Sequence, residues 1–271
     1  MGQRNSIYYH LVRYFKTLGR LDGKVVVDIP AGHGQISSPL QQQGATIKAL
    51  DLYPEKIQGE GIEKIYADMN HRLPLSDNSV DFVLCLEGIE HIHNQFGLLV
   101  ELNRILKPGG SLILTTPSLS HIRARLSTLL VESEYWKRMP ASEVDSVWFS
   151  ETESSRIYFG HVYLINASHL RTLTALSGFS IQQRLWTNIS TSSVVLSVLF
   201  YPFIVLASFI ALIDSWRKHR NDMNAEKRRI YWEQLRINIS PVTLFCKDIF
   251  WVLNKQRNFH ENIDFLRKMQ R

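Results

Sequence analysis

Lys24-Val25-Val26-Val27-Asp28-Ile29-Pro30-Ala31-Gly32-His33-Gly34-Gln35-Ile36 is the stretch that decides the fold of this chain. Three β-branched residues followed by an acid predict a buried parallel strand, which here runs into a tight strand-to-helix loop. Gly32 and Gly34 lack a Cβ, so the loop can turn sharply and a ligand can approach its N–H groups. Asp28 ends the strand, where it can accept hydrogen bonds from a cationic ligand or from the loop amides. Because ligands bind at the carboxyl ends of strands in open α/β sheets, we expect a binding site here.

The segments that follow repeat this pattern of an apolar strand that ends in an acid. Asp51 ends the second strand about twenty residues after the loop, the spacing at which a carboxylate reaches a ribose diol. Asp68 follows a third short apolar run, and Glu87 ends a fourth strand that begins at Val80. A turn at Pro108-Gly109-Gly110 then leads into a fifth strand. A single Gly-x-Gly is a weak signal that a plain turn would also explain, but the ordered series is far more specific.

In this order, residues 20 to 187 resemble the class I S-adenosylmethionine (SAM)-dependent methyltransferases of the small-molecule type, similar to the ubiquinone-biosynthesis and related lipid or sugar enzymes. The resemblance implies an α/β fold, a Rossmann-like seven-stranded sheet with helices on both faces, and SAM as the cofactor. One position departs from the family pattern, because Pro30 stands where the first glycine of the loop is usual. Proline has no N–H, so one possible donor to the ligand is absent. Ala31, Gly32 and Gly34 remain able to meet the cofactor.

The resemblance also assigns residues to the parts of the cofactor. It places Asp51 on the ribose hydroxyls, with Leu52 beside the adenine, and Asp68 and Met69 against the adenine amino group and face. The helix that follows the glycine-bearing loop would favour the SAM carboxylate through its N-terminal amides. The complete set of candidate cofactor-binding residues is Asp28, Ala31, Gly32, Gly34, Asp51, Leu52, Asp68, Met69 and Glu87.

The segment after the fourth strand contains the candidate catalytic residues. Methyl transfer is an in-line displacement at a sulfonium carbon, so the protein chiefly aligns the acceptor and excludes water. For a hydroxyl acceptor, a nearby base helps by taking the proton, and His91 with the adjacent Glu90 is the first candidate. His93 and His161 are the other candidates; a histidine here would otherwise cap a helix or face solvent. No Cys/His cluster has metal-ligand spacing, so no metal is implied.

Residues 118–157 form a long insertion after the fifth expected strand, rich in aromatic and basic side chains. In similar enzymes specificity is commonly set by such an excursion, so we expect it to contact the substrate or to act as a lid. Its side chains suit a bulky acceptor that is anionic or glycosidic, although they equally suit a lid with a small core of its own. These residues include Arg123, Arg125, Tyr135, Trp136, Lys137, Arg138, Trp148 and Phe149.

The C-terminal part of the chain carries a long uncharged run. Residues 185–213 contain no charged side chain, and the apolar part from Val194 to Ile213 is long enough to span a membrane. The alternative for a soluble protein is a last sheet strand at residues 193–200 followed by a buried helix. From Asp214 onward there are 13 Lys and Arg against 7 Asp and Glu, which accounts for the whole net charge of +6.

Two constraints decide the expected orientation of this run. SAM chemistry places the first part of the chain in the cytosol, and the basic residues after the run also favour the cytosolic side. A re-entrant or monotopic segment that bends near Pro202 satisfies both, because proline removes a hydrogen bond inside a helix. Residues 242–257 mix apolar and basic side chains and are expected to form a second amphipathic, membrane-binding stretch. Nucleic acid is not expected as a partner, because the uncharged run does not suit it.

We therefore expect a SAM-dependent methyltransferase domain at residues 1–190 and a membrane-associating helical extension, first apolar and then basic, at residues 191–271. Cys85 and Cys246 are too few for a disulfide framework and suit a reducing cytosol. The expected function is methylation, with oxygen favoured as the acceptor atom, of a lipid or lipid-linked prenyl or glycan acceptor at the cytosolic membrane face. The alternatives are an inactive membrane-attached SAM-binding scaffold and a soluble small-molecule methyltransferase whose apolar run is an oligomerisation surface. The sequence leaves the acceptor and the oligomeric state open.

Overall fold

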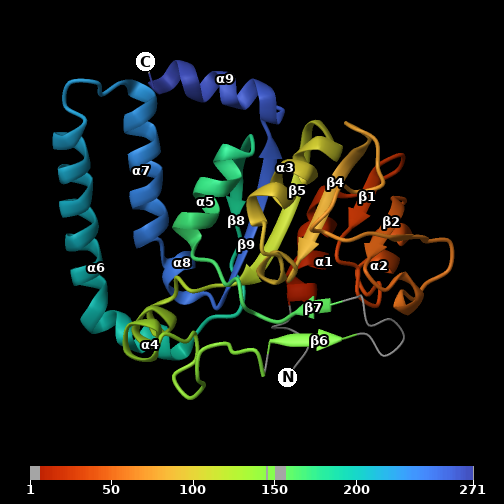
Figure 1. Ribbon diagram of the computed structural model, residues 1–271, viewed down its shortest axis with the longest axis horizontal. Coiled ribbons are helices and arrows are strands. Elements are labelled where there is room, and N and C mark those ends of the chain that lie inside the picture. The colour runs from red at the N-terminus through yellow and green to blue at the C-terminus, as the bar shows by residue number, and fades with distance from the viewer. Residues whose placement is uncertain (1–6, 145, 150–156, 271) are drawn as a thin grey trace.

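The computed structural model describes residues 7–144, 146–149 and 157–270, and its centre is a seven-stranded sheet with strand order β3-β2-β1-β4-β5-β9-β8 (Figure 1). β1 to β5 are parallel to one another, and β9 runs antiparallel to both of its neighbours. The expected Rossmann-like α/β fold is thereby confirmed. The strands of the sheet are β1 (Val25–Asp28), β2 (Thr46–Asp51), β3 (Glu63–Tyr66), β4 (Val80–Leu86), β5 (Leu106–Pro117), β8 (Phe179–Arg184) and β9 (Asp248–Lys255).

Helices cover both faces of the sheet, and successive residues of a central strand pack against opposite faces. In β4, Val83 and Cys85 belong to one apolar core and Leu84 to the other, as the alternation of side chains along a strand requires. α3 and α5 supply the first core, and α1 and α2 supply the second. The helices are α1 (Ile7–Leu18), α2 (Ser37–Gln42), α3 (Gln95–Ile105), α4 (Ile122–Val131), α5 (Ala167–Leu176), α6 (Thr191–Lys218), α7 (Ala225–Ile239), α8 (Pro241–Phe245) and α9 (Phe259–Gln270), with single turns η2 (Pro54–Lys56) and η3 (Ile89–His91).

The strand β9 corrects the expected domain boundary. Residues 242–257 were expected to bind a membrane as an amphipathic stretch, but Asp248–Lys255 form a strand between β5 and β8. Its residues from Ile249 to Leu253 are all buried. A strand covered on both faces by helices has a continuous apolar run and no alternation, so its sequence resembles that of a membrane-facing segment. The division at residue 190 is therefore wrong, because the last part of the chain completes the sheet.

The uncharged run forms α6, which lies between β8 and β9 in the sequence together with α7 and α8. The alternative of a last sheet strand at residues 193–200 is wrong, since these residues are helical. Figure 1 shows the first turns of α6 beside α4 and the remainder alongside α7, on the outside of the molecule. Within the described residues, α6 is the one helix long and apolar enough, by length and composition, to cross a membrane. Pro202 lies inside this helix.

The insertion expected at residues 118–157 forms α4 and the strand β6 (Val147–Phe149), which pairs with β7 (Ile157–Phe159). Its residues 145 and 150–156 lie outside the described part of the chain. Arg125, a candidate for contact with the substrate, instead holds the helices together. Its guanidinium donates to the Ser120 carbonyl oxygen at 2.7 Å and to Asn238 Oδ1 of α7 at 2.8 Å. A lid function of the insertion stays a prediction.

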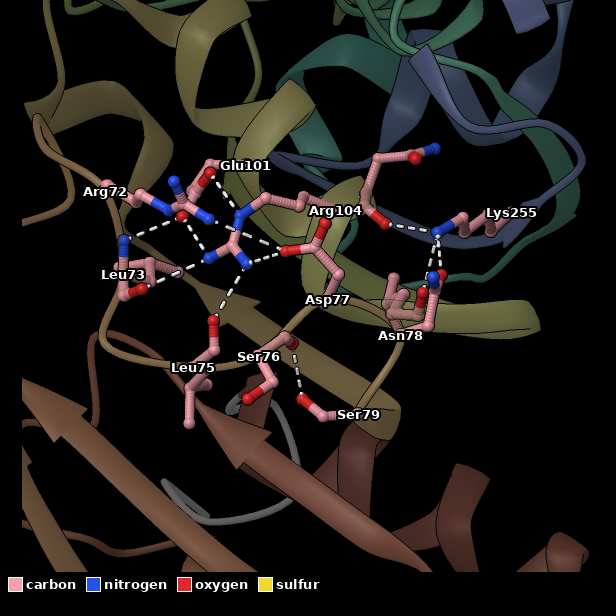
Figure 2. A network of polar contacts seen from close by, with 12 residues as sticks. Arg72, Leu73, Leu75, Ser76, Asp77, Asn78, Ser79, Glu101, Arg104 and Lys255 are labelled. Carbon is pink, nitrogen blue, oxygen red and sulfur yellow. Dashed lines mark hydrogen bonds and ion pairs between the residues drawn. The ribbon is translucent and has the colours of Figure 1, made fainter. Parts of the chain in front are cut away.

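The half-buried Arg104 and the buried Lys255 hold the loop between β3 and β4 and the end of β9 in place (Figure 2). The Arg104 guanidinium donates to Asp77 Oδ1 at 2.5 Å, to the Leu75 carbonyl oxygen at 2.8 Å and to the Glu101 carboxylate. Lys255, only 4% exposed, donates through Nζ to Asn78 Oδ1 at 2.8 Å and to the carbonyl oxygens of Asn103 and Leu106 at 2.7 Å. A basic residue that was expected at a membrane surface therefore joins β9 to α3 and β5.

Lys255→Met is expected to lower the free energy of unfolding by about 2–4 kcal/mol, because it leaves two buried carbonyl oxygens without a donor. Chemical denaturation of the full-length protein measures this loss. Lys268→Met on the exposed side of α9 is the matched control and should change the unfolding free energy by less than about 0.5 kcal/mol. Equal effects of the two substitutions would show that the Lys255 contacts do not stabilise the fold.

Candidate functional site

A cavity of about 600 Å³ opens at the carboxyl ends of the central parallel strands. The loops after β1, β2, β3 and β4 form most of its wall, and Ile7 and Tyr8 of α1, His91 of η3 and Phe159 of β7 complete it. The parallel strands bring these loops together, since all their carboxyl ends meet at one edge of the sheet. Eight of the nine candidate cofactor-binding residues line this cavity, namely Asp28, Ala31, Gly32, Asp51, Leu52, Asp68, Met69 and Glu87.

Asp51 connects the loops after β1 and β2 in the wall of the cavity. Its Oδ2 accepts a hydrogen bond from the Gly32 amide at 2.8 Å, and its Oδ1 accepts one from the Tyr53 amide at 2.9 Å. A carboxylate oxygen has two lone pairs, so each oxygen keeps the capacity to accept a ligand hydroxyl. This geometry is compatible with the expected place of the ribose.

Gly34 is the one candidate cofactor-binding residue that does not line the cavity. Its φ of +76° is in the left-handed region, and a Cβ added there would lie 2.8 Å from the Gln58 carbonyl oxygen. Gly34 therefore allows the backbone to pack tightly against Gln58. Pro30 does line the cavity, and its ring packs so closely on Gly88 that a Cβ at Gly88 would lie 2.4 Å from Pro30 Cδ. The proline that departs from the family pattern thus joins the loops after β1 and β4.

Three acids at the ends of β1 and β4 give the site an unusual protonation behaviour. Burial raises the pKa of Asp28 to about 7, although a hydrogen bond from the Ser37 hydroxyl at 2.8 Å opposes the shift. Burial also raises the pKa of Glu87, and the nearby Glu90 raises it further. The pKa of Glu90 is raised by its own burial. Such carboxyls gain most from a positively charged ligand, which favours their ionised form.

SAM binding is expected to strengthen as the pH rises from about 6 to about 8, because SAM carries a positive sulfonium. Below the raised pKa values the carboxyls hold protons that the cation must displace, and this displacement costs free energy. Above these values the cost disappears. Calorimetry in two buffers of different ionisation enthalpy measures the protons released on binding. Glu87→Gln should flatten the pH dependence, and an equally steep dependence in this variant would remove Glu87 from the explanation.

His91 is held in the neutral form with a defined tautomer. Its Nδ1 lies 2.6 Å from the Phe159 carbonyl oxygen, which can only accept, so Nδ1 carries the proton. Burial lowers the pKa of His91, so the ring is neutral at pH 7. The side chain is 8% exposed and lines the cavity. A neutral imidazole is the form that can accept a proton from an acceptor hydroxyl.

Glu90 and His161 lie beside His91, with Glu90 Oε1 3.9 Å from His91 Nε2, whereas His93 lies apart from them. Glu90 does not line the cavity and is fully buried, where its Oε2 accepts from the Thr116 hydroxyl at 2.9 Å. His93 is exposed and lies outside the cavity. The His161 ring lies 5.2 Å from the His91 ring, and the pKa of His161 is raised chiefly by Glu134.

Glu90, His91 and His161 form a group that could hold a metal ion, although no metal-ligand spacing is visible in the sequence. One ligand atom from each lies within 4.8 Å of the others. Glu90 Oε1 is buried without a hydrogen-bond partner, and His91 Nδ1 bonds a backbone carbonyl oxygen, as the nitrogen that does not bind the metal usually does in metal-binding histidines. The fold brings His161 to this place from a loop that follows β7, so no local sequence signal could have found the group.

Comparisons with known proteins agree with this geometry. A family profile described as a methyltransferase domain matches residues 3–184. Ubiquinone biosynthesis O-methyltransferases from Xanthomonas euvesicatoria and Xanthomonas oryzae are 28% and 30% identical to this chain over 137 and 139 residues. Each match covers 47% of this chain and 56% or 57% of the relative, so the chain spans about half the length of the curated relatives it matches.

Solved structures show the same fold. A methyltransferase structure from Bacillus halodurans has a TM-score of 0.54 at 14% identity and covers 91% of this chain and 99% of that chain. A SAM-dependent methyltransferase from Mesorhizobium loti has a TM-score of 0.50 at 12% identity, with 92% and 98% covered. By its fold, its ordered loops and its family profile, this chain belongs to the class I SAM-dependent methyltransferases.

Proposed function

We propose that this protein transfers the methyl group of SAM to a hydroxyl of a lipid or lipid-linked acceptor, at the cytosolic face of a membrane. The observation that carries the proposal is the cavity in which Asp51, Glu87 and His91 lie together at the carboxyl ends of the strands. SAM bound in this cavity would supply its methyl group to the acceptor oxygen and leave as S-adenosylhomocysteine, and His91 Nε2 would take the hydroxyl proton. The O-methyltransferases of ubiquinone biosynthesis among the relatives favour an oxygen acceptor of lipid type.

The outward face of α6 supports the membrane part of the proposal. Large apolar side chains there are exposed, among them Val198 at 85% and Phe203 at 62%. Two of its serines point the other way, since Ser208 Oγ accepts from Asn238 Nδ2 at 2.7 Å and Ser193 Oγ lies 3.0 Å from His121 Nδ1. A helix with polar residues against the protein and apolar residues outside is the reverse of one on a soluble surface. This pattern favours a helix that lies in the membrane interface with its outer face in the acyl region.

Val198→Glu/Leu206→Glu is expected to release the protein from membranes, with a loss of at least about tenfold in the partition coefficient, because a charge in hydrocarbon costs about 2.5–3.5 kcal/mol. Vesicle sedimentation of the full-length protein measures the partition. Gln42→Glu/Thr46→Glu adds the same charge at exposed positions of α2 and β2, in the half of the sheet away from β8, and should leave partition unchanged. If the wild type stays in solution as a defined oligomer, the soluble alternative replaces the membrane proposal.

A measurement of turnover distinguishes an active enzyme from a scaffold that binds SAM without transferring its methyl group. The full-length protein is incubated with SAM and a membrane lipid extract, and S-adenosylhomocysteine is measured. We expect its release to depend on the extract. SAM binding without release, with extracts from several sources, would favour the inactive scaffold.

A further inference from the structure

A second cavity, of about 580 Å³, lies at the open edge of the sheet between the edge strand β8 and the helix α7. It shares no lining residue with the candidate active site. Figure 1 shows α7 between α6 and the sheet, so this groove lies behind the apolar helix. Its lining residues are Ile181, Gln182, Gln183 and Arg184 of β8, with Arg229, Trp232, Glu233, Arg236 and Ile237 of α7. We call it the arginine groove.

The charges of the arginine groove are not balanced. Glu233 is its one acid, and its Oε2 already accepts from Arg171 Nη2 at 2.8 Å. Arg229 forms an ion pair with Glu226. Among the described residues, Arg184 and Arg236 form no ion pair, although Glu233 lies close enough to attract the Arg184 guanidinium, which Arg236 repels. The groove therefore holds two guanidinium groups that no carboxylate contacts in an ion pair.

Buried donor atoms in and beside the groove also lack acceptors. Arg184 Nη1 is buried and has no hydrogen-bond partner, and neither does Arg171 Nε beside Glu233. Burial lowers the pKa of Arg184, which reflects the cost of desolvating its charge. A buried guanidinium N–H without an acceptor is unfavourable, and an anion with several oxygens would satisfy it. Guanidinium groups bind phosphate in a bidentate manner, so a phosphate is the ligand that this donor set matches.

The position of Trp232 connects the groove to the membrane-facing helix. The Trp232 ring packs edge-on against Trp216 and Phe209 of α6, at centroid distances of 5.9 and 6.5 Å. Trp and Arg side chains are typical of the headgroup level of a membrane, next to the acyl region. With the outer face of α6 in the acyl region, the groove lies where phosphates of lipid headgroups are found.

We propose that the arginine groove binds the phosphate of an anionic lipid, with Arg184 and Arg236 as the principal ligands and Trp232 at the boundary with α6. This inference rests on the proposed membrane attachment through α6. A headgroup bound in the groove would fix the orientation of α6 at the membrane surface, because α7 lines the groove and packs along α6. The same donors would also bind a free phosphate ion. The experiment must therefore distinguish a lipid phosphate from a free one.

The test compares full-length protein on vesicles of phosphatidylcholine alone and of phosphatidylcholine with phosphatidylglycerol. The wild type is expected to bind the anionic vesicles about tenfold more tightly than the neutral ones. Arg184→Gln/Arg236→Gln should lose most of this preference and keep its binding to neutral vesicles and to SAM. The matched control is Arg217→Gln/Lys218→Gln, which removes the same charge from the exposed end of α6 and should keep most of the preference.

Four results would overturn the inference. An equal loss of preference in the groove variant and the control would mean that general charge attracts the protein to anionic lipid. Thermal stabilisation by inorganic phosphate that the groove variant loses, combined with an unchanged lipid preference, would make the groove a free-phosphate site. Binding of the wild type to neither kind of vesicle would overturn the membrane proposal as well, whereas binding to both without preference would overturn the groove alone.

Discussion

His91→Ala is expected to lower the rate of methyl transfer about 10²- to 10⁴-fold while SAM affinity stays nearly unchanged, because a positioned general base contributes a factor of this size. The structure supports this expectation through the buried, neutral ring whose Nδ1 bonds the Phe159 carbonyl oxygen. Release of S-adenosylhomocysteine with an active lipid extract measures turnover, and calorimetry measures SAM affinity. His93→Ala, two residues away and outside the cavity, is the matched control and should keep full activity.

The same assay separates two ways in which His91 can act. A general base is insensitive to chelators, whereas a metal ligand is not, so wild-type turnover is measured with and without EDTA. Loss of activity in EDTA that a divalent cation restores would assign His91, together with Glu90 and His161, to a metal site. Normal turnover of His91→Ala in the absence of EDTA would remove the residue from the mechanism altogether.

Asp51→Ala is expected to weaken SAM binding by about 1–3 kcal/mol, the cost of leaving buried polar groups unpaired. The side chain accepts from the amides of Gly32 and Tyr53, so the substitution removes a contact to the ribose and also loosens the two loops that hold the cofactor. Calorimetry on the detergent-solubilised full-length protein measures the change. Asp264→Ala, on the exposed side of α9, is the control and should bind SAM as the wild type does.

Asp51→Asn keeps one oxygen acceptor and therefore should bind SAM with an affinity between those of the wild type and Asp51→Ala. Chemical denaturation of each variant shows whether it is folded. An unchanged SAM affinity in a folded Asp51→Ala variant would contradict the cofactor assignment at β2. If the folded wild type did not bind SAM, this would indicate that the loop containing Pro30 has diverged and no longer binds the cofactor.

The grouping of most candidate cofactor-binding residues around one cavity was predictable because these residues are local in the sequence. Each candidate acid follows an apolar strand, and in a parallel sheet the carboxyl ends of the strands converge, so strand order alone brings Asp28, Asp51 and Glu87 together. Gly34 shows the limit of this reasoning. A glycine pattern indicates a tight turn. Only the path of the segment around Gln58 shows that Gly34 packs against its backbone and does not line the cavity.

The acceptor side of the site depended on contacts between distant segments. His91 Nδ1 is fixed by a carbonyl oxygen of β7, and His161 reaches Glu90 from the loop that follows. Nothing in the local pattern near residue 90 indicates that Glu90 is buried behind the cavity. Contacts between side chains that are far apart in the sequence produce no local periodicity or spacing. Sequence patterns therefore cannot predict them.

The sequence by itself determined the parallel α/β half of the sheet, the cofactor loops and an apolar run long enough to span a membrane. Only the tertiary structure decided that residues 248–255 complete the sheet as β9. The physical reason is that the apolar side chains of a stretch show that it is removed from water. They do not show whether protein or lipid covers it. Helices cover β9 on both faces, whereas the outer face of α6 remains exposed, and these two outcomes follow from packing between residues far apart in the chain.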